Sequence, residues 1–218
     1  MTQLTKEMYK IFDQPEFSFK KIKENKTSQE VDKLKTQFKE VWQVWKQVNQ
    51  SVAKQLPEGL VAKVHVESWT NGWNLRDHYW ASYRLAKFAD CNPCIGVMID
   101  KKQFQVYLMF QHYKSEKRQG SVEKYNQLLK DIPTWSENLN LDNWYIWDKD
   151  DMEFNDHLLL SNYLKNNTLR KSFNEKANQT SFLVGKFAFR DVDKIDNMEE
   201  FILAGIKEIL PLYEKIGE

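Results

Sequence analysis

The chain has 218 residues, of which 41% are hydrophobic and 14% aromatic, so it can bury a substantial core. Its 32 lysine and arginine residues nearly balance its 31 acidic residues, which excludes a uniformly basic nucleic-acid binder but not a local basic patch. The N-terminus lacks the pattern of a signal peptide, and the longest apolar runs are too short to span a bilayer. We therefore expect a cytoplasmic protein with no membrane partner.

A long amphipathic helix is predicted over residues 28–56, after a short one over residues 4–12. Thr27 and Glu30 form a capping-box pattern at its start, and apolar residues then recur at alternating steps of three and four. This apolar stripe consists of Val31, Leu34, Phe38, Val41, Trp45, Val48 and Val52. It suits packing on the chain's own sheet, and it also suits a coiled-coil seam between two copies.

The next elements are strands. Apolar and polar side chains alternate over residues 60–69, which predicts a half-buried strand. Asn71 and Gly72 predict a turn, because both residues tolerate positive φ. Residues 78–88 fit either a helix or a strand, and their many aromatic side chains favour a strand.

A tight hairpin follows, with Lys101 and Lys102 as its two-residue loop. This register predicts one wholly apolar face made of Ile95, Val97, Ile99, Phe104, Val106 and Leu108. The other face carries Gln105, Tyr107, Met109, Gln111 and Tyr113. Gly96 stands opposite Tyr107, and it either leaves room for a ligand beside the ring or marks a β-bulge.

The remaining elements alternate between helix and strand. We expect a helix over 121–132 ended by Pro133, a strand over 144–147, a helical stretch over 157–177 interrupted near Asn166, a strand over 181–189 and a closing helix over 199–216. No linker or repeat divides the chain. The pattern predicts a single α+β domain over 1–218, with a central, mostly antiparallel twisted sheet flanked by helices, among them the long N-terminal amphipathic helix and the C-terminal helix.

Common catalytic motifs do not occur in the sequence. The glycines are scattered, so neither a dinucleotide fingerprint nor a phosphate-binding P-loop is present. The acidic stretch 148–156 lacks the glycine of a calcium loop, and we expect a solvated loop there. Cys91 and Cys94 precede a strand rather than a helix, which favours two reduced loop thiols over a redox pair. We predict no metal and no cofactor.

Residues 69–118 combine polar amide side chains with the aromatic rings of tryptophan and tyrosine and with lysine and arginine side chains. Cationic side chains there suit phosphates, while aromatic rings suit stacking on a base. The predicted ligand-binding residues are Trp73, Tyr107 and Tyr113 for stacking, Arg76, Lys114 and Arg118 for phosphate, and Asn71, Gln105 and Gln111 for polar edges. The alternative interpretation is that the rings belong to the core and the basic residues to the surface.

Two resemblances add to this picture. The patterns W-x-N-G-W-x-L-R at 69–76 and VYLMFQHYKSE at 106–116, with the C-terminal strand and helix, resemble a small family of uncharacterised bacterial proteins. Some of its members carry an automated label of glucose-6-phosphate dehydrogenase. The layout also resembles the N-terminal DNA-binding domain of the modified-cytosine restriction GTPase, which implies an aromatic pocket for a flipped base at Trp73 or Tyr107.

The favoured hypothesis is a binding module for nucleic acid or a nucleotide. One alternative is an enzyme that acts on a phosphorylated small molecule such as a sugar phosphate, with the same basic residues as anion clamps. Another is an interaction protein that binds a protein partner or forms a homodimer through the 28–56 helix. The sequence does not specify the ligand, a reaction or the oligomeric state.

Overall fold

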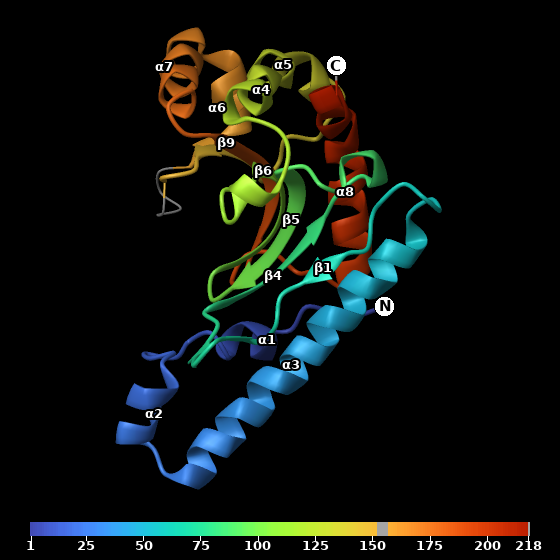
Figure 1. Cartoon of the computed structure of the whole chain (residues 1–218). Helices are drawn as coiled ribbons and strands as arrows, with labels where there is room; N and C mark the ends of the chain where they lie inside the picture. The colour runs from blue at the N-terminus through green and yellow to red at the C-terminus, as the bar shows by residue number, and fades with distance from the viewer. Residues whose placement is uncertain (152–156, 218) are drawn as a thin grey trace.

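The computed structural model describes residues 1–151 and 157–217. Its centre is a seven-stranded sheet in the order β1-β4-β5-β6-β9-β7-β8, and each pair of neighbours is antiparallel (Figure 1). These strands are β1 (His65–Val66), β4 (His78–Tyr83), β5 (Pro93–Asp100), β6 (Gln103–Phe110), β7 (Trp144–Asp148), β8 (Leu158–Leu159) and β9 (Phe182–Phe189). A separate hairpin consists of β2 (Thr70–Asn71) and β3 (Asn74–Leu75). The predicted α+β class and antiparallel sheet are confirmed.

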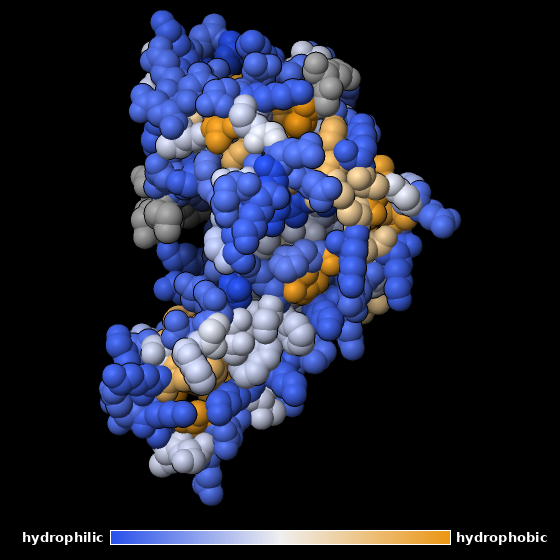
Figure 2. Space-filling model, viewed as in Figure 1, coloured by the Kyte–Doolittle hydropathy of each residue, from blue (hydrophilic) through white to orange (hydrophobic). Residues whose placement is uncertain are grey.

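Helices flank the sheet. The α-helices are α1 (Lys6–Lys10), α2 (Phe19–Asn25), α3 (Ser28–Gln55), α4 (Val122–Asn126), α5 (Ile132–Ser136), α6 (Leu160–Lys165), α7 (Asn167–Ala177) and α8 (Met198–Glu214). Short 3-10 helices are η1 (Ala86–Phe88), η2 (Ser115–Lys117), η3 (Gln127–Lys130) and η5 (Lys215–Gly217). Figure 1 shows α3 and α8 on one side of the sheet, with α4 to α7 gathered at one end. The surface seen from the same direction is mostly hydrophilic, with hydrophobic residues in separate patches (Figure 2). Within the described part of the chain, no helix is both long and apolar enough to cross a membrane.

The first face of the sheet packs against α3 and α8 and forms the main core. All six apolar residues predicted for one face of the β5–β6 hairpin are buried there. The helix α3 begins with the predicted capping box at Thr27 and Glu30, and its apolar stripe lies in the same core. The stripe is therefore used within the chain and does not form an open seam for a second copy.

The β5–β6 register is the predicted one. The ladder runs without interruption from Pro93 opposite Phe110 to Ile99 opposite Phe104, so Gly96 marks no bulge. The space beside Gly96 is filled by the protein itself: a Cβ built on Gly96 would lie 2.7 Å from Cζ of Tyr107. The expectation of an open space beside this ring was wrong, because the ring lies over the glycine.

The second face of the sheet carries a smaller cluster of Trp80, Cys94, Tyr107, Trp147 and Phe187, all buried. Strand β9 supplies apolar residues to both faces, since its alternate residues Phe182 and Val184 belong to the main core. The strand order places β9 beside β6. Phe187 of β9 can therefore pack in the same cluster as Tyr107 of β6, and the second face of the sheet becomes a second packing surface.

Several element boundaries differ from the sequence predictions. Only His65–Val66 of the expected strand over 60–69 joins the sheet, at its edge. Residues 78–88 divide into β4 and η1. Pro133 does not end a helix but lies in the first turn of α5, where its missing N–H leaves no helical bond unmade. The break near Asn166 is confirmed, because the side chain of Asn166 caps α7.

Candidate aromatic binding site on the β2–β3 hairpin

The β2–β3 hairpin is a tight turn held firmly against the body of the protein. Asn71 pairs with Asn74, and Gly72 with Trp73 forms the two-residue loop. Gly72 has a φ of 59°, a conformation that a glycine adopts at little cost. Leu75 is buried, and its N–H donates to the Phe17 carbonyl at 2.8 Å. The turn predicted from Asn71 and Gly72 is confirmed.

Trp73 projects from the tip of this hairpin. Its side chain is 87% exposed, although large rings are mostly buried in folded proteins. Its carbonyl accepts a hydrogen bond from the Phe19 N–H at 3.1 Å, which ties the loop to the start of α2. Trp73 lines a hollow of about 450 Å³ together with Phe19, Lys20, Lys23 and Glu24. Among the described residues, neither Lys20 nor Lys23 forms an ion pair, so both ammonium groups are available to an anion.

The opposite side of the hairpin is polar. A hollow of about 280 Å³ there is lined by Glu16, Phe17, Ser18, Asn71, Asn74, Leu75, Arg76, Asp77 and His78. Arg76 forms a salt bridge of 2.7 Å with Glu67, and about four-fifths of each side chain is buried. In the described part of the chain, the amides of Asn71 and Asn74 make no side-chain hydrogen bond. The hairpin thus brings together the predicted site residues Asn71, Trp73 and Arg76.

Tyr113, Lys114 and Arg118 lie in a different place, the turn at residues 111–120, which we call the Tyr113 turn. Tyr113 is 67% exposed, and the Lys114 ammonium lies 4.9 Å from the centre of its ring. Arg118 donates from Nη1 to the Tyr113 carbonyl at 3.0 Å. The predicted combination of ring and cations is therefore present in this turn, separately from the hairpin.

The other predicted residues, Gln105, Tyr107 and Gln111, are buried. Gln105 and Tyr107 belong to β6, and Gln111 directly follows this strand. The Tyr107 hydroxyl accepts a hydrogen bond from Trp80 Nε1 at 2.9 Å, and burial raises the pKa of Tyr107 above its ordinary value. Gln105 accepts from Gln103 Nε2 at 3.1 Å, and Gln111 accepts from Arg84. These side chains are occupied by contacts within the protein, so the accessible candidates are those of the hairpin and the Tyr113 turn.

A protein-family model matches residues 4–216 of the chain. The chain belongs to this family. The family resemblance found in the sequence is thereby confirmed, and it is a family of uncharacterised proteins. A curated relative from Haemophilus influenzae, named "Uncharacterized protein", is 27% identical over 218 residues, which are 99% of this chain and 99% of the relative. Neither match carries the dehydrogenase label or the likeness to the restriction GTPase domain.

The two cysteines of this family member are unsuited to thiolate chemistry. Cys94 is fully buried, and burial raises the pKa of its thiol to about 11. Burial, followed by the nearby Asp90 carboxylate, also raises the pKa of Cys91. Burial thus favours the protonated form of both thiols. Within the described residues, no group of three or more histidine, cysteine or acidic side chains is arranged to hold a metal ion.

The acidic stretch 148–156 is only partly described, because residues 152–156 lie outside the described residues. Asp148 is 1% exposed, so the expectation of a solvated loop was wrong at this residue. The Thr180 hydroxyl donates to Asp148 Oδ2 at 2.5 Å, and the Asp150 N–H donates to Oδ1 at 2.9 Å. These hydrogen bonds satisfy the buried carboxylate, which makes it a structural group of the loop.

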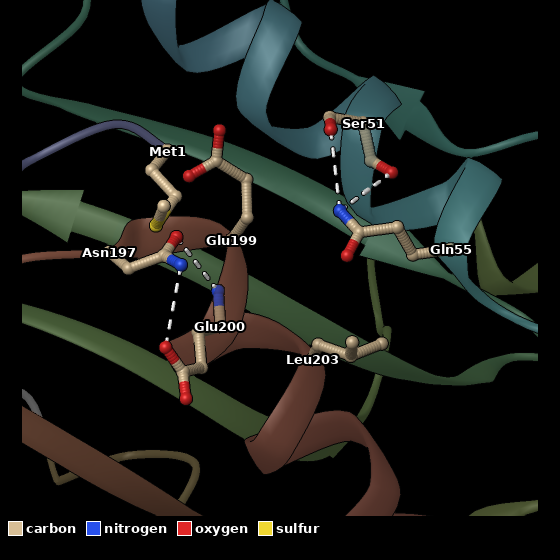
Figure 3. A pocket seen from close by; sticks show the side chains of 7 residues that line it. All are labelled: Met1, Ser51, Gln55, Asn197, Glu199, Glu200 and Leu203. Carbon is tan, nitrogen blue, oxygen red and sulfur yellow. Dashed lines mark hydrogen bonds between the residues drawn. The ribbon is translucent and has the colours of Figure 1, made fainter.

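A hollow of about 270 Å³ between α3 and the start of α8 was not expected from the sequence. Figure 3 shows the residues that line it, namely Met1, Ser51, Gln55, Asn197, Glu199, Glu200 and Leu203. Its polar groups bond to one another or to the N-terminal segment: Glu199 accepts from Thr2, and Asn197 accepts from the Glu200 N–H. This hollow joins the N-terminal segment to α8, and its groups serve the fold.

Proposed function

We propose that this protein binds single-stranded nucleic acid and that one base stacks on Trp73. The observation that carries the proposal is the exposed indole of Trp73 beside the ammonium groups of Lys20 and Lys23, which form no ion pair with any residue that the structure describes. An aromatic ring offers its face to any base, and one stacked base contributes roughly 1–3 kcal/mol. The two lysines would meet the phosphates on either side of that base.

The rigidity of the hairpin supports this proposal. Backbone hydrogen bonds join Phe19 to Trp73 and Leu75 to Phe17, so the backbone that carries the exposed indole is already held in place. A ligand would not have to order the loop, and this lowers the cost of binding. A single strand is favoured over a duplex because the faces of its bases are open to stacking, whereas a duplex hides them.

The polar side of the hairpin adds hydrogen-bonding groups for the same ligand. Asn71 and Asn74 are cross-strand neighbours, and their amides offer both donors and acceptors to base edges. Arg76 is already paired with Glu67, and we propose that it contacts phosphate through its remaining N–H groups. The overall charge of the chain is only +1, so the electrostatic part of binding would come from this local group of cations.

The direct test is fluorescence anisotropy of labelled single strands of about twelve nucleotides. We expect Trp73→Ala to weaken binding by roughly 5- to 150-fold, the range that corresponds to one stacked base. Trp73→Phe keeps a ring and should retain much of the affinity. Val192→Ala is the matched control, because Val192 is an exposed apolar residue on another loop and is 82% exposed. Equal affinities of the wild type and Trp73→Ala would contradict the proposal.

Salt dependence tests the part played by the lysines. Each phosphate contact on a single strand should contribute about 0.7 to the slope of log affinity against log salt concentration. The double substitution Lys20→Gln and Lys23→Gln should therefore flatten the slope, while Lys54→Gln on the far part of α3 should leave it unchanged. Binding to anionic lipid vesicles combined with no binding to oligonucleotides would show that the exposed indole serves a membrane surface, contrary to the proposal.

A further inference from the structure

We infer that the Tyr113 turn is a second contact for the same strand, in which Tyr113 stacks on another base and Lys114, Lys117 and Arg118 face phosphates. This inference rests on the proposed function and adds to it a minimum length of the ligand. A strand that reaches only the hairpin would use Trp73 alone. A longer strand would also reach Tyr113.

The first observation is exposure. Among the described residues, Trp73 and Tyr113 are the aromatic side chains that the fold leaves exposed, at 87% and 67%. Both stand on tight turns and beside cations. Every other tryptophan and tyrosine among the described residues is buried or half-buried. The same chemistry is thus presented twice on the surface.

The second observation is that the Tyr113 turn is held in place from beneath. Asn92, which is 2% exposed, donates from Nδ2 to the carbonyls of Ser115 and Gly120 at 3.3 and 3.1 Å. Its backbone also bonds to Gln111 and Gln119. A turn anchored by one buried amide at several points presents its outer side chains without a large loss of entropy on binding.

The third observation is the backbone at Lys114. Its φ of 56° is in the left-handed region, which residues other than glycine and asparagine rarely adopt. The chain reverses there, so the ring of Tyr113 remains outside the fold with the Lys114 ammonium beside it. Unfavourable backbone conformations of this kind persist where the surrounding structure enforces them, and they are frequent at binding sites.

The charge of the turn fits a phosphate backbone. Lys114, Lys117 and Arg118 form no ion pairs within the part of the chain that the structure describes. Arg118 uses Nη1 for the Tyr113 carbonyl and retains further donors. Glu116 is the acidic residue of η2, so the turn has an excess of positive charge. Phosphate contacts at such a turn would orient the strand while Tyr113 stacks.

The hairpin and the turn lie at opposite ends of β4 and β5, which pair from His78 opposite Asp100 to Tyr83 opposite Ile95. On one side, Arg76 of the hairpin pairs with Glu67, whose N–H donates to the Trp80 carbonyl at 3.0 Å. On the other side, Asn92 directly precedes β5, and its side chain donates to the carbonyls of Ser115 and Gly120 in the turn. Trp80 on β4 and Cys94 on β5 both belong to the cluster on the second face. A strand crossing this face would connect the two contacts.

The test is a length series of labelled oligothymidine, from about three to about eighteen nucleotides, measured with the wild type, Tyr113→Ala, Tyr113→Phe and Trp73→Ala. We expect Tyr113→Ala to leave the affinity for the shortest strands unchanged and to weaken binding of strands above a threshold length by roughly 5- to 150-fold. Tyr113→Phe keeps the ring and should behave like the wild type. Because Tyr113 is exposed, the fold should be unchanged, which near-ultraviolet circular dichroism verifies.

The outcomes separate this inference from the proposed function. If Trp73→Ala weakens binding at every length while Tyr113→Ala has no effect at any length, the proposed function stands and the second contact is overturned. If Tyr113→Ala weakens the shortest and the longest strands by the same factor, the two rings do not contact successive parts of one strand, which also overturns the inference. If the wild type binds no strand of any length, both proposals fail.

Discussion

The ring of Tyr107 fills the space beside Gly96 of the neighbouring strand, so no room is left there for a ligand. A Cβ on Gly96 would lie 2.7 Å from Tyr107 Cζ and 3.0 Å from Trp80 Nε1. On the other side of β6, Gly185 stands opposite Tyr107 in the β6–β9 ladder, and a Cβ there would overlap the Tyr107 side chain and backbone. A row of glycine, tyrosine and glycine across three strands therefore permits the ring to be buried.

This row predicts that Gly96→Ala destabilises the protein. The new methyl group would collide with the Tyr107 ring, and overpacking of this kind costs about 1–3 kcal/mol of unfolding free energy. Urea denaturation followed by far-ultraviolet circular dichroism measures the change. In a Tyr107→Leu background the ring is absent, and Gly96→Ala should cost clearly less. An equal cost in both backgrounds would mean that the ring does not occupy this space.

Removing the hydroxyl of Tyr107 tests the hydrogen bond to Trp80. In Tyr107→Phe, the buried Trp80 Nε1–H loses its acceptor at 2.9 Å, which should lower the unfolding free energy by about 1–3 kcal/mol. The exposed Tyr113 supplies the matched control, because Tyr113→Phe removes the same hydroxyl from a solvated ring. Similar urea midpoints for Tyr107→Phe and the wild type would show that the indole N–H finds another partner.

The N-terminal segment should contribute a pH-dependent part of the stability through Glu199. Burial, the largest influence, raises the pKa of Glu199, but hydrogen bonds from Thr2 and the charge of the N-terminal ammonium together hold this pKa below its ordinary value. The folded state then binds fewer protons than the unfolded state. The contribution is present above the unfolded-state pKa of about 4.3 and is lost as the pH falls through the folded-state pKa.

We therefore expect Glu199→Gln to lower the urea midpoint at about pH 7 and to differ less from the wild type at about pH 3. The measurement is a series of urea titrations across this range. Glu58→Gln serves as a control, since Glu58 is an exposed residue in the turn after α3. A difference between Glu199→Gln and the wild type that stays constant with pH would contradict a stabilising ionised carboxylate at this position.

Local patterns determined what the sequence could predict. The capping box at Thr27 and Glu30 and the spacing of apolar residues predicted α3, because these signals depend on neighbours within the same helix. The β5–β6 register followed from the requirement that one face be wholly apolar. The turn at Gly72 was likewise signalled by adjacent residues, whereas the sequence left open whether Trp73 would be exposed or buried in the core.

Contacts between distant segments could not be predicted in this way. The burial of Tyr107 depends on Gly185, which reaches it only because β9 lies beside β6. Gln111 is occupied by Arg84 through the same kind of long-range packing. The predicted site residues all lie in the segment 69–118 of the sequence, but the fold distributes them over an exposed hairpin, an exposed turn and a buried strand face.

The intrinsic fluorescence of Trp73 gives the most direct test of the central claim that an accessible indole binds a base. The wild type and Trp73→Phe are titrated with the same single strand, at about 50 and about 200 mM salt. The account predicts quenching in the wild type that is lost in Trp73→Phe and is weaker at the higher salt concentration. Quenching of equal size in both proteins, or none in either, would contradict it.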